Sequence, residues 1–187
     1  MQRRDWIDIK KFLFIVIILI IFLYAVVPMG LKLVFPFYHQ EAIEFYATKH
    51  DIDPLLVASI IWVESRFDAR AESPRGARGL MQIMPETGEW ISEQINVPYD
   101  LQRLYDPNHN IRLGCWYLAN LRHEFGGNMN LVLAAYNGGR GNVRSWMDAG
   151  IWQGDKENID NIPFGETREY VRRVNMIYQI YQKLYRN

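Results

Sequence analysis

One acidic residue, Glu64, falls on the apolar side of a predicted helix. Asp53-Pro54 gives the N-cap and first-turn signals of a helix start. Ile60 and Ile61 lie four and three positions before Glu64, so the three side chains share a face. Burial and the negative end of the helix dipole both disfavour the ionised carboxylate and raise its pKa, which suits a general acid near neutral pH. A buried Glu that only pairs with an Arg would show the same pattern, so this helix alone leaves both interpretations open.

The elements that must position Glu64 are predicted to be helices. Apolar spacing and capping signals indicate helices over 41–49, 54–66, 86–95, 107–125, 131–136 and 142–148, and a last helix that begins at Glu166 or Thr167. The stretch 68–79 is rich in Ser, Pro, Gly and Arg and long enough to be a functional loop, in which we expect Asp68 to be solvated. Pro85 argues against a central strand over 79–85. The predicted fold class is all-α, with room only for a small hairpin in the loops.

The amino-acid composition limits the kinds of function that are expected. The 187 residues are 49% hydrophobic and 14% aromatic, which suits one packed domain plus an appendage. The 21 basic residues balance 21 acidic ones, so a nucleic-acid binder held by a basic field is not expected. Cys115 is the only cysteine, which excludes an intramolecular disulfide, and the four His show no metal-ligand spacing. We therefore predict no cofactor and no metal.

The N-terminus carries a candidate membrane anchor. Residues 12–27 contain no charge, the apolar run continues to Leu31, and Arg3, Arg4, Lys10 and Lys11 precede it. This pattern predicts a cytoplasmic tail at 1–11, a transmembrane anchor at 12–31, a linker at 32–40 and an extracytoplasmic domain at 41–187 of a single-pass membrane protein. The alternative is secretion after signal-peptide cleavage, but residues 25–30 match a cleavage site poorly.

Four motifs resemble those of the soluble-lytic-transglycosylase (SLT) catalytic domain, and they occur in the family's order. They are Glu64-Ser65-Arg66-Phe67, the stretch 73–85, Ala134-Ala135-Tyr136-Asn137-Gly138-Gly139, and the stretch 162–171. The resemblance covers roughly residues 40–185 and implies the lysozyme-like helical fold that this family shares with goose-type lysozymes. It also implies cleavage of the β-1,4 bond between N-acetylmuramic acid and N-acetylglucosamine in peptidoglycan. In that reaction no water is consumed, because the muramyl C6 hydroxyl attacks C1 and leaves a 1,6-anhydro ring.

The resemblance assigns the catalytic role to Glu64, which would act first as acid and then as base. A substrate groove around it would be lined by Ser73, Gln82, Met84, Tyr136, Asn137, Glu166 and Tyr170. In the family, the tyrosine at the position of Tyr136 can hydrogen-bond the catalytic Glu. Without the resemblance, Ser73 would be a turn residue before Pro74, and the segment at Tyr136 would be a helix end.

Other side chains are open to more than one interpretation. Trp116 and Tyr117 could stack on sugar rings or pack in the core. Arg75 and Arg78 lie in the loop that should border the groove, where they could meet carboxylates of the peptide stems.

Three alternatives compete with the transglycosylase. A hydrolytic muramidase would need a second group to activate water, and no second carboxylate is placed beside Glu64 on its helix. A non-catalytic glycan-binding module would tolerate the loss of Glu64, and a membrane structural protein would leave the four motifs unexplained. The expected partners are peptidoglycan strands, the membrane through the N-terminal helix, and envelope-assembly proteins whose identity the sequence does not give.

Overall fold

The structure, a computed structural model, describes residues 2–186. The chain divides into two compact units, one ending at Phe37 and one beginning at Tyr38.

The first unit is one continuous helical rod. It consists of α1 (Gln2–Ile21), a π-helical turn (η1, Phe22–Val26) and α2 (Val27–Val34). Pro28 does not end the helix, because it sits in the first turn of α2, where a proline removes no required hydrogen bond. The 26-residue stretch Ile9–Val34 contains an 18-residue window with a mean hydropathy of 3.1 and no buried residue, so this helix is a candidate membrane span. The expected N-terminal apolar helix is confirmed, and it extends three residues beyond Leu31.

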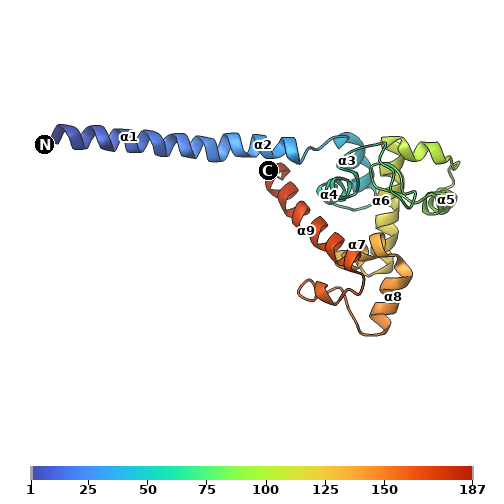
Figure 1. The fold of residues 1–187 in the computed structure, drawn as a ribbon. Helices are drawn as coiled ribbons and strands as arrows, with labels where there is room; N and C mark the ends of the chain where they lie inside the picture. The colour runs from blue at the N-terminus through green and yellow to red at the C-terminus, as the bar shows by residue number, and fades with distance from the viewer. Residues whose placement is uncertain (1, 187) are drawn as a thin grey trace. The chain divides into compact units, whose positions relative to one another are not determined.

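The second unit is built from seven α-helices and two short 3₁₀ helices (Figure 1). They are α3 (Gln40–Lys49), α4 (Pro54–Ser65), α5 (Pro85–Gln94), η2 (Leu101–Tyr105), α6 (Pro107–Glu124), α7 (Met129–Gly138), α8 (Arg140–Asp148), η3 (Ile159–Asn161) and α9 (Gly165–Tyr185). Between Tyr38 and Arg186 no strand forms, and Arg78 makes isolated bridges to Glu72 and Ile83. The all-α prediction is confirmed, and in place of the small hairpin the loop has only these two isolated bridges.

Helix α4 is the centre of this unit. Every residue from Leu55 to Trp62 is buried, and α9 and α3 both pack against the helix. Asp53 begins it by accepting a 2.8 Å hydrogen bond from the Leu55 amide. It ends at Arg66, whose φ of 54° is left-handed and whose guanidinium lies 3.6 Å from the centroid of the Trp62 ring. The buried helix therefore delivers its last turn, which includes Glu64, to the edge of the core.

The loop after α4 is fixed to α6 by one buried side chain, Asn110. Its amide nitrogen donates to the Arg78 and Leu104 carbonyls at 3.0 and 2.8 Å, and its oxygen accepts from the Met81 amide at 2.8 Å. Gly79 is required at this junction, because its φ is +75° and a Cβ there would lie 2.1 Å from the Leu104 carbonyl oxygen. The loop is thus an ordered wall next to the end of α4.

Candidate active site

Glu64 lies in the last turn of α4, where the residue as a whole is partly exposed. Burial of the carboxyl among protein atoms raises its pKa from 4.5 to about 7. Hydrogen bonding from Tyr170 and the positive charge of Arg173 oppose that rise, while the negative charge of Glu166 adds to it. A carboxyl with this pKa is present in both protonation states near neutral pH, as an acid that later becomes a base requires.

The Tyr170 hydroxyl faces Glu64 from α9. It is buried and makes no hydrogen bond of normal geometry with the residues that the structure describes. It nevertheless lies near enough to the Glu64 carboxyl to lower the pKa of that group by hydrogen bonding. Hydrogen bonding from this hydroxyl favours the ionised form of Glu64.

Tyr136 lies near the same carboxyl but bonds elsewhere. Burial raises the pKa of Tyr136 well above its ordinary value, and the charge of Glu64 adds to that rise. Its hydroxyl donates to the backbone carbonyl of Met81 at 2.7 Å rather than to Glu64. Tyr136 thus ties α7 to the loop that carries Gln82.

Ser73 and Gln82 both stabilise the loop on which they lie. The Ser73 hydroxyl accepts from the Ala77 amide at 3.0 Å and so closes a tight turn. The Gln82 side chain donates to the Ala71 and Gly79 carbonyls at 3.1 and 3.0 Å, from a backbone with φ of 47°. Their hydrogen bonds within the loop give both residues a structural role at the groove wall.

Ser65 and Met84 mark the two ends of this wall. The Ser65 hydroxyl donates to the Leu80 carbonyl at 2.8 Å and so joins the end of α4 to the loop. Met84, partly exposed, is the N-cap position of α5. Ser65 belongs to the first motif, yet the sequence analysis gave it no role, because its contact is with a residue fifteen positions away.

Two more of the predicted site residues, Asn137 and Glu166, lie where α7 meets α9. The Thr167 hydroxyl donates to the Asn137 side-chain oxygen at 2.8 Å. Glu166, in the first turn of α9, forms a 3.5 Å ion pair with Arg75, and both side chains are more exposed than buried, at 67% and 79%. The ion pair links the start of α9 to the loop 68–79, so residues from the second and fourth motifs meet in space.

The aromatic residues that were open to two interpretations lie in one cluster. The Trp116 ring packs edge-on against Trp90 at 5.5 Å, and the Tyr117 ring lies 5.5 Å from Tyr136. Arg140 lies over the Trp90 ring at 5.0 Å. Trp116 and Tyr117 are half-buried, so most of their surface packs against protein.

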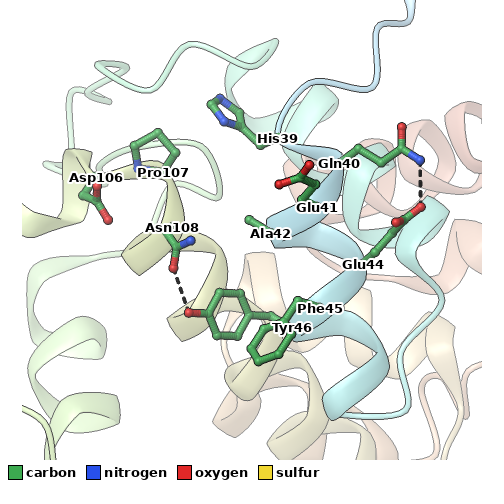
Figure 2. Close-up of a pocket in the computed structure, with 10 residues that line it drawn as sticks. All are labelled: His39, Gln40, Glu41, Ala42, Glu44, Phe45, Tyr46, Asp106, Pro107 and Asn108. Carbon is green, nitrogen blue, oxygen red and sulfur yellow. Dashed lines mark hydrogen bonds between the residues drawn. The ribbon is translucent and has the colours of Figure 1, made fainter.

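A second hollow lies between α3 and the start of α6 (Figure 2). Its volume is about 1050 Å³, and none of the predicted site residues lines it. Glu41, Glu44 and Asp106 make it acidic, and Tyr46 donates to Asn108 across it at 2.7 Å. The candidate chemistry is therefore at the end of α4 and not in this hollow.

Two other kinds of site, a cysteine nucleophile and a metal site, find no support among the residues that the structure describes. Burial raises the pKa of the Cys115 thiol to about 12, so it is a core residue and not a nucleophile. Within residues 2–186, no group of three His, Cys, Asp or Glu side chains could hold a metal ion.

Comparison with known proteins agrees with this arrangement. The sequence model of the Transglycosylase SLT domain matches residues 41–159. The soluble lytic murein transglycosylase of Escherichia coli K12 is 34% identical over 154 residues, which are 81% of this chain and 24% of that protein. The membrane-bound lytic murein transglycosylase F of Desulfosudis oleivorans is 34% identical over 145 residues, covering 70% of this chain and 30% of that one.

Solved structures show the same relationship. The 70-kDa soluble lytic transglycosylase of Escherichia coli has a TM-score of 0.77 at 33% identity, over 82% of this chain and 25% of its own. An inactive glutamate-to-glutamine mutant of lytic transglycosylase Slt from Pseudomonas aeruginosa has a TM-score of 0.75 at 35% identity, with the same coverage. This chain spans about a quarter of the length of these soluble relatives. With its family match, its relatives and its helical fold, the chain belongs to the Transglycosylase SLT domain family.

Proposed function

We propose that this chain is a lytic transglycosylase that cleaves the β-1,4 bond between N-acetylmuramic acid and N-acetylglucosamine and leaves 1,6-anhydromuramyl ends. The observation that carries the proposal is Glu64, a partly exposed residue whose carboxyl has its pKa raised to about 7 by burial. The names of the relatives, lytic murein transglycosylases, support the substrate class. The inactive glutamate-to-glutamine mutant of the Pseudomonas relative supports dependence on one glutamate.

The proposed reaction uses one carboxyl twice. Protonated Glu64 donates its proton to the glycosidic oxygen as the bond from that oxygen to C1 breaks. The resulting carboxylate then accepts the proton of the muramyl C6 hydroxyl as its oxygen bonds to C1, so Glu64 is restored and no water is consumed. The raised pKa favours the first step, and the Tyr170 hydroxyl can stabilise the carboxylate between the two steps.

The surroundings of Glu64 favour this route over hydrolysis. Glu166 is the acidic residue whose charge raises the pKa of Glu64, and it is exposed and ion-paired with Arg75. Asp68 is exposed and accepts from the Arg70 amide at 2.8 Å in its own loop. An inverting or retaining hydrolase needs a second carboxylate poised for water or for C1, whereas Glu166 is paired with Arg75 and Asp68 is bonded within its own loop.

Product analysis tests the proposal. Purified peptidoglycan digested with the full chain in detergent should yield muropeptides with 1,6-anhydromuramyl ends by mass spectrometry, and Glu64→Gln should yield none. Products heavier by one water per cut would show hydrolysis instead. Binding without products from either protein would favour a glycan-binding module.

We also propose that residues 12–31 anchor the enzyme in the membrane, between a cytoplasmic tail at 1–11 and a linker at 32–40 that leads to an extracytoplasmic domain at 41–187. The apolar helix Ile9–Val34 and the basic residues before the apolar core support this orientation. Protease treatment of intact cells stripped of outer layers should degrade the domain and spare the tail. A membrane-free protein that lacks its first residues would indicate cleavage and secretion.

A further inference from the structure

The cations that border the groove are already paired within the protein. Arg75 forms an ion pair with Glu166, and Arg78 pairs with Glu72 at 3.3 Å. Arg66 stacks on the Trp62 ring. The two arginines that the sequence suggested for substrate carboxylates thus both have protein partners.

Arg173 differs from these residues. On α9, positions 166, 170 and 173 are spaced by four and three residues, so their side chains lie on one face of the helix. Tyr170, the middle member, is buried against Glu64, whereas Glu166 and Arg173 are exposed on either side of it. Among residues 2–186, Arg173 has no ion pair.

The neighbouring Arg172 provides a contrast. It pairs with Asp160 and with Glu169, the latter at 2.7 Å. One position along the helix turns a side chain by about 100° away from the 166–170–173 face. The two adjacent arginines therefore have different surroundings, because Arg172 is paired within the protein and Arg173 has no ion pair among the described residues.

The positive charge of Arg173 affects the pKa of the Glu64 carboxyl. It lowers the pKa of Glu64, whereas Arg172 has no such effect on that group. Helix α9 packs against α4, and Arg173 is one turn from the buried Tyr170 on the same face of α9, so its exposed guanidinium lies at the edge of the contact between these two helices.

We propose that Arg173 binds a carboxylate of the substrate, next to the muramyl residue at Glu64, and so makes the enzyme prefer anionic glycan. An exposed guanidinium has donors in a planar fork that matches a carboxylate. The carboxylate belongs either to the peptide stem or, in stripped glycan, to the free lactyl group of muramic acid. This inference rests on the proposed function, because it places peptidoglycan in the groove.

Binding measured without turnover tests it. In the Glu64→Gln full chain, affinity is compared for three ligands: peptide-bearing glycan strands, amidase-stripped strands with free lactyl carboxylates, and chitooligosaccharides, which carry no carboxylate. Each is measured with Arg173 intact, with Arg173→Gln, with Arg173→Lys, and with Arg172→Gln as the matched control.

We expect Arg173→Gln to weaken binding of a carboxylate-bearing ligand by roughly fivefold at low salt, as fits one exposed ion pair. Binding of chitooligosaccharides should be unchanged, Arg173→Lys, which keeps the charge but not the planar fork, should restore only part of the loss, and the difference should shrink as salt is raised. A loss limited to peptide-bearing strands identifies the stem carboxylate, and a loss with stripped strands identifies the lactyl carboxylate.

Three results would overturn the inference. They are equal binding of anionic glycans by Arg173→Gln and its parent, an equal loss for chitooligosaccharides, or an equal loss in Arg172→Gln. If the parent bound none of the three ligands, the proposed function itself would fail, and this inference with it.

Discussion

The hydroxyl of Tyr136 donates a 2.7 Å hydrogen bond to the backbone carbonyl of Met81, fifty-five residues away in the sequence. The bond joins α7 to the loop wall beside Glu64, and the Tyr136 ring packs against Tyr117 on its other side. Tyr136 therefore holds the loop beside the end of α4, whereas the Tyr170 hydroxyl is the one that acts on the carboxyl of Glu64, the proposed acid and base.

Removal of the Tyr136 hydroxyl should weaken the wall without changing how Glu64 titrates. We expect Tyr136→Phe to lower the free energy of unfolding by about 1 kcal/mol and activity by roughly tenfold, with the pH of the activity maximum unchanged. Activity, denaturant unfolding and a pH–rate profile measure the three quantities.

A matched control is Tyr178→Phe, which removes a 2.7 Å hydrogen bond to Asp53 at the far end of α4. Tyr178→Phe should lower the free energy of unfolding by a similar amount and leave activity close to that of the wild type. If Tyr136→Phe moved the pH profile instead, Tyr136 would be acting on Glu64 directly.

The raised pKa of Glu64 should be visible in stability. In the unfolded chain this carboxyl titrates near 4.5, and in the folded protein near 7. The folded state therefore holds this proton more tightly, so the contribution of Glu64 to stability is greatest below pH 4.5 and is lost as the pH rises to about 7. Glu64→Gln lacks this loss and should be more stable than the wild type at pH 8, by up to about 3 kcal/mol.

Denaturant unfolding of both proteins at pH 4, 6 and 8 measures this difference. The advantage of Glu64→Gln should be near zero at pH 4 and grow across the window. The same change at the exposed Glu157 shows whether removing any negative charge has that effect. A constant difference between wild type and Glu64→Gln at all three pH values would contradict the raised pKa.

Two neighbours of Glu64 should move its pH–rate profile in opposite directions. Glu64 must be protonated to donate, so kcat/KM should fall as the pH rises through about 7. Tyr170→Phe removes a group that lowers the pKa of Glu64, so this fall should move to higher pH. Glu166→Gln removes a charge that raises the pKa, so the fall should move to lower pH. Profiles of kcat/KM from pH 5 to 9 test both variants. Shifts in the same direction would contradict the opposite effects of Tyr170 and Glu166 on the pKa of Glu64.

The helix boundaries near the site followed from local signals in the sequence. Asp53-Pro54 and Asp106-Pro107 begin α4 and α6 as predicted, because a capping side chain and a proline act within one turn. The position of Glu64 in the last turn of α4 followed from the same periodicity. These features depend on residues a few positions apart, which a sequence displays directly.

The contacts between segments did not follow from the sequence. Nothing local indicates that Arg75 would pair with Glu166, or that Tyr136 would bond to Met81, because each pair meets only after the helices pack. Asn110 was also missed, since a polar residue inside a helix is usually exposed. A signal was present: Asn110 has apolar neighbours at Ile111 and Gly114, on the side that proves to be buried.

Asn110 should be one of the largest single contributors to the stability of the groove wall. Its side chain is fully buried and satisfies three backbone groups, at Arg78, Met81 and Leu104. Asn110→Leu keeps a similar volume but leaves these groups without their partner, so we expect a loss of roughly 3 kcal/mol in the free energy of unfolding. Activity should fall further than stability alone explains, because the freed loop carries Gln82.

Asn161→Leu, at an exposed position, should change the free energy of unfolding by less than about 0.5 kcal/mol. Denaturant unfolding of the two variants decides the matter, and an equal, small effect in both would show that the loop is held by other contacts.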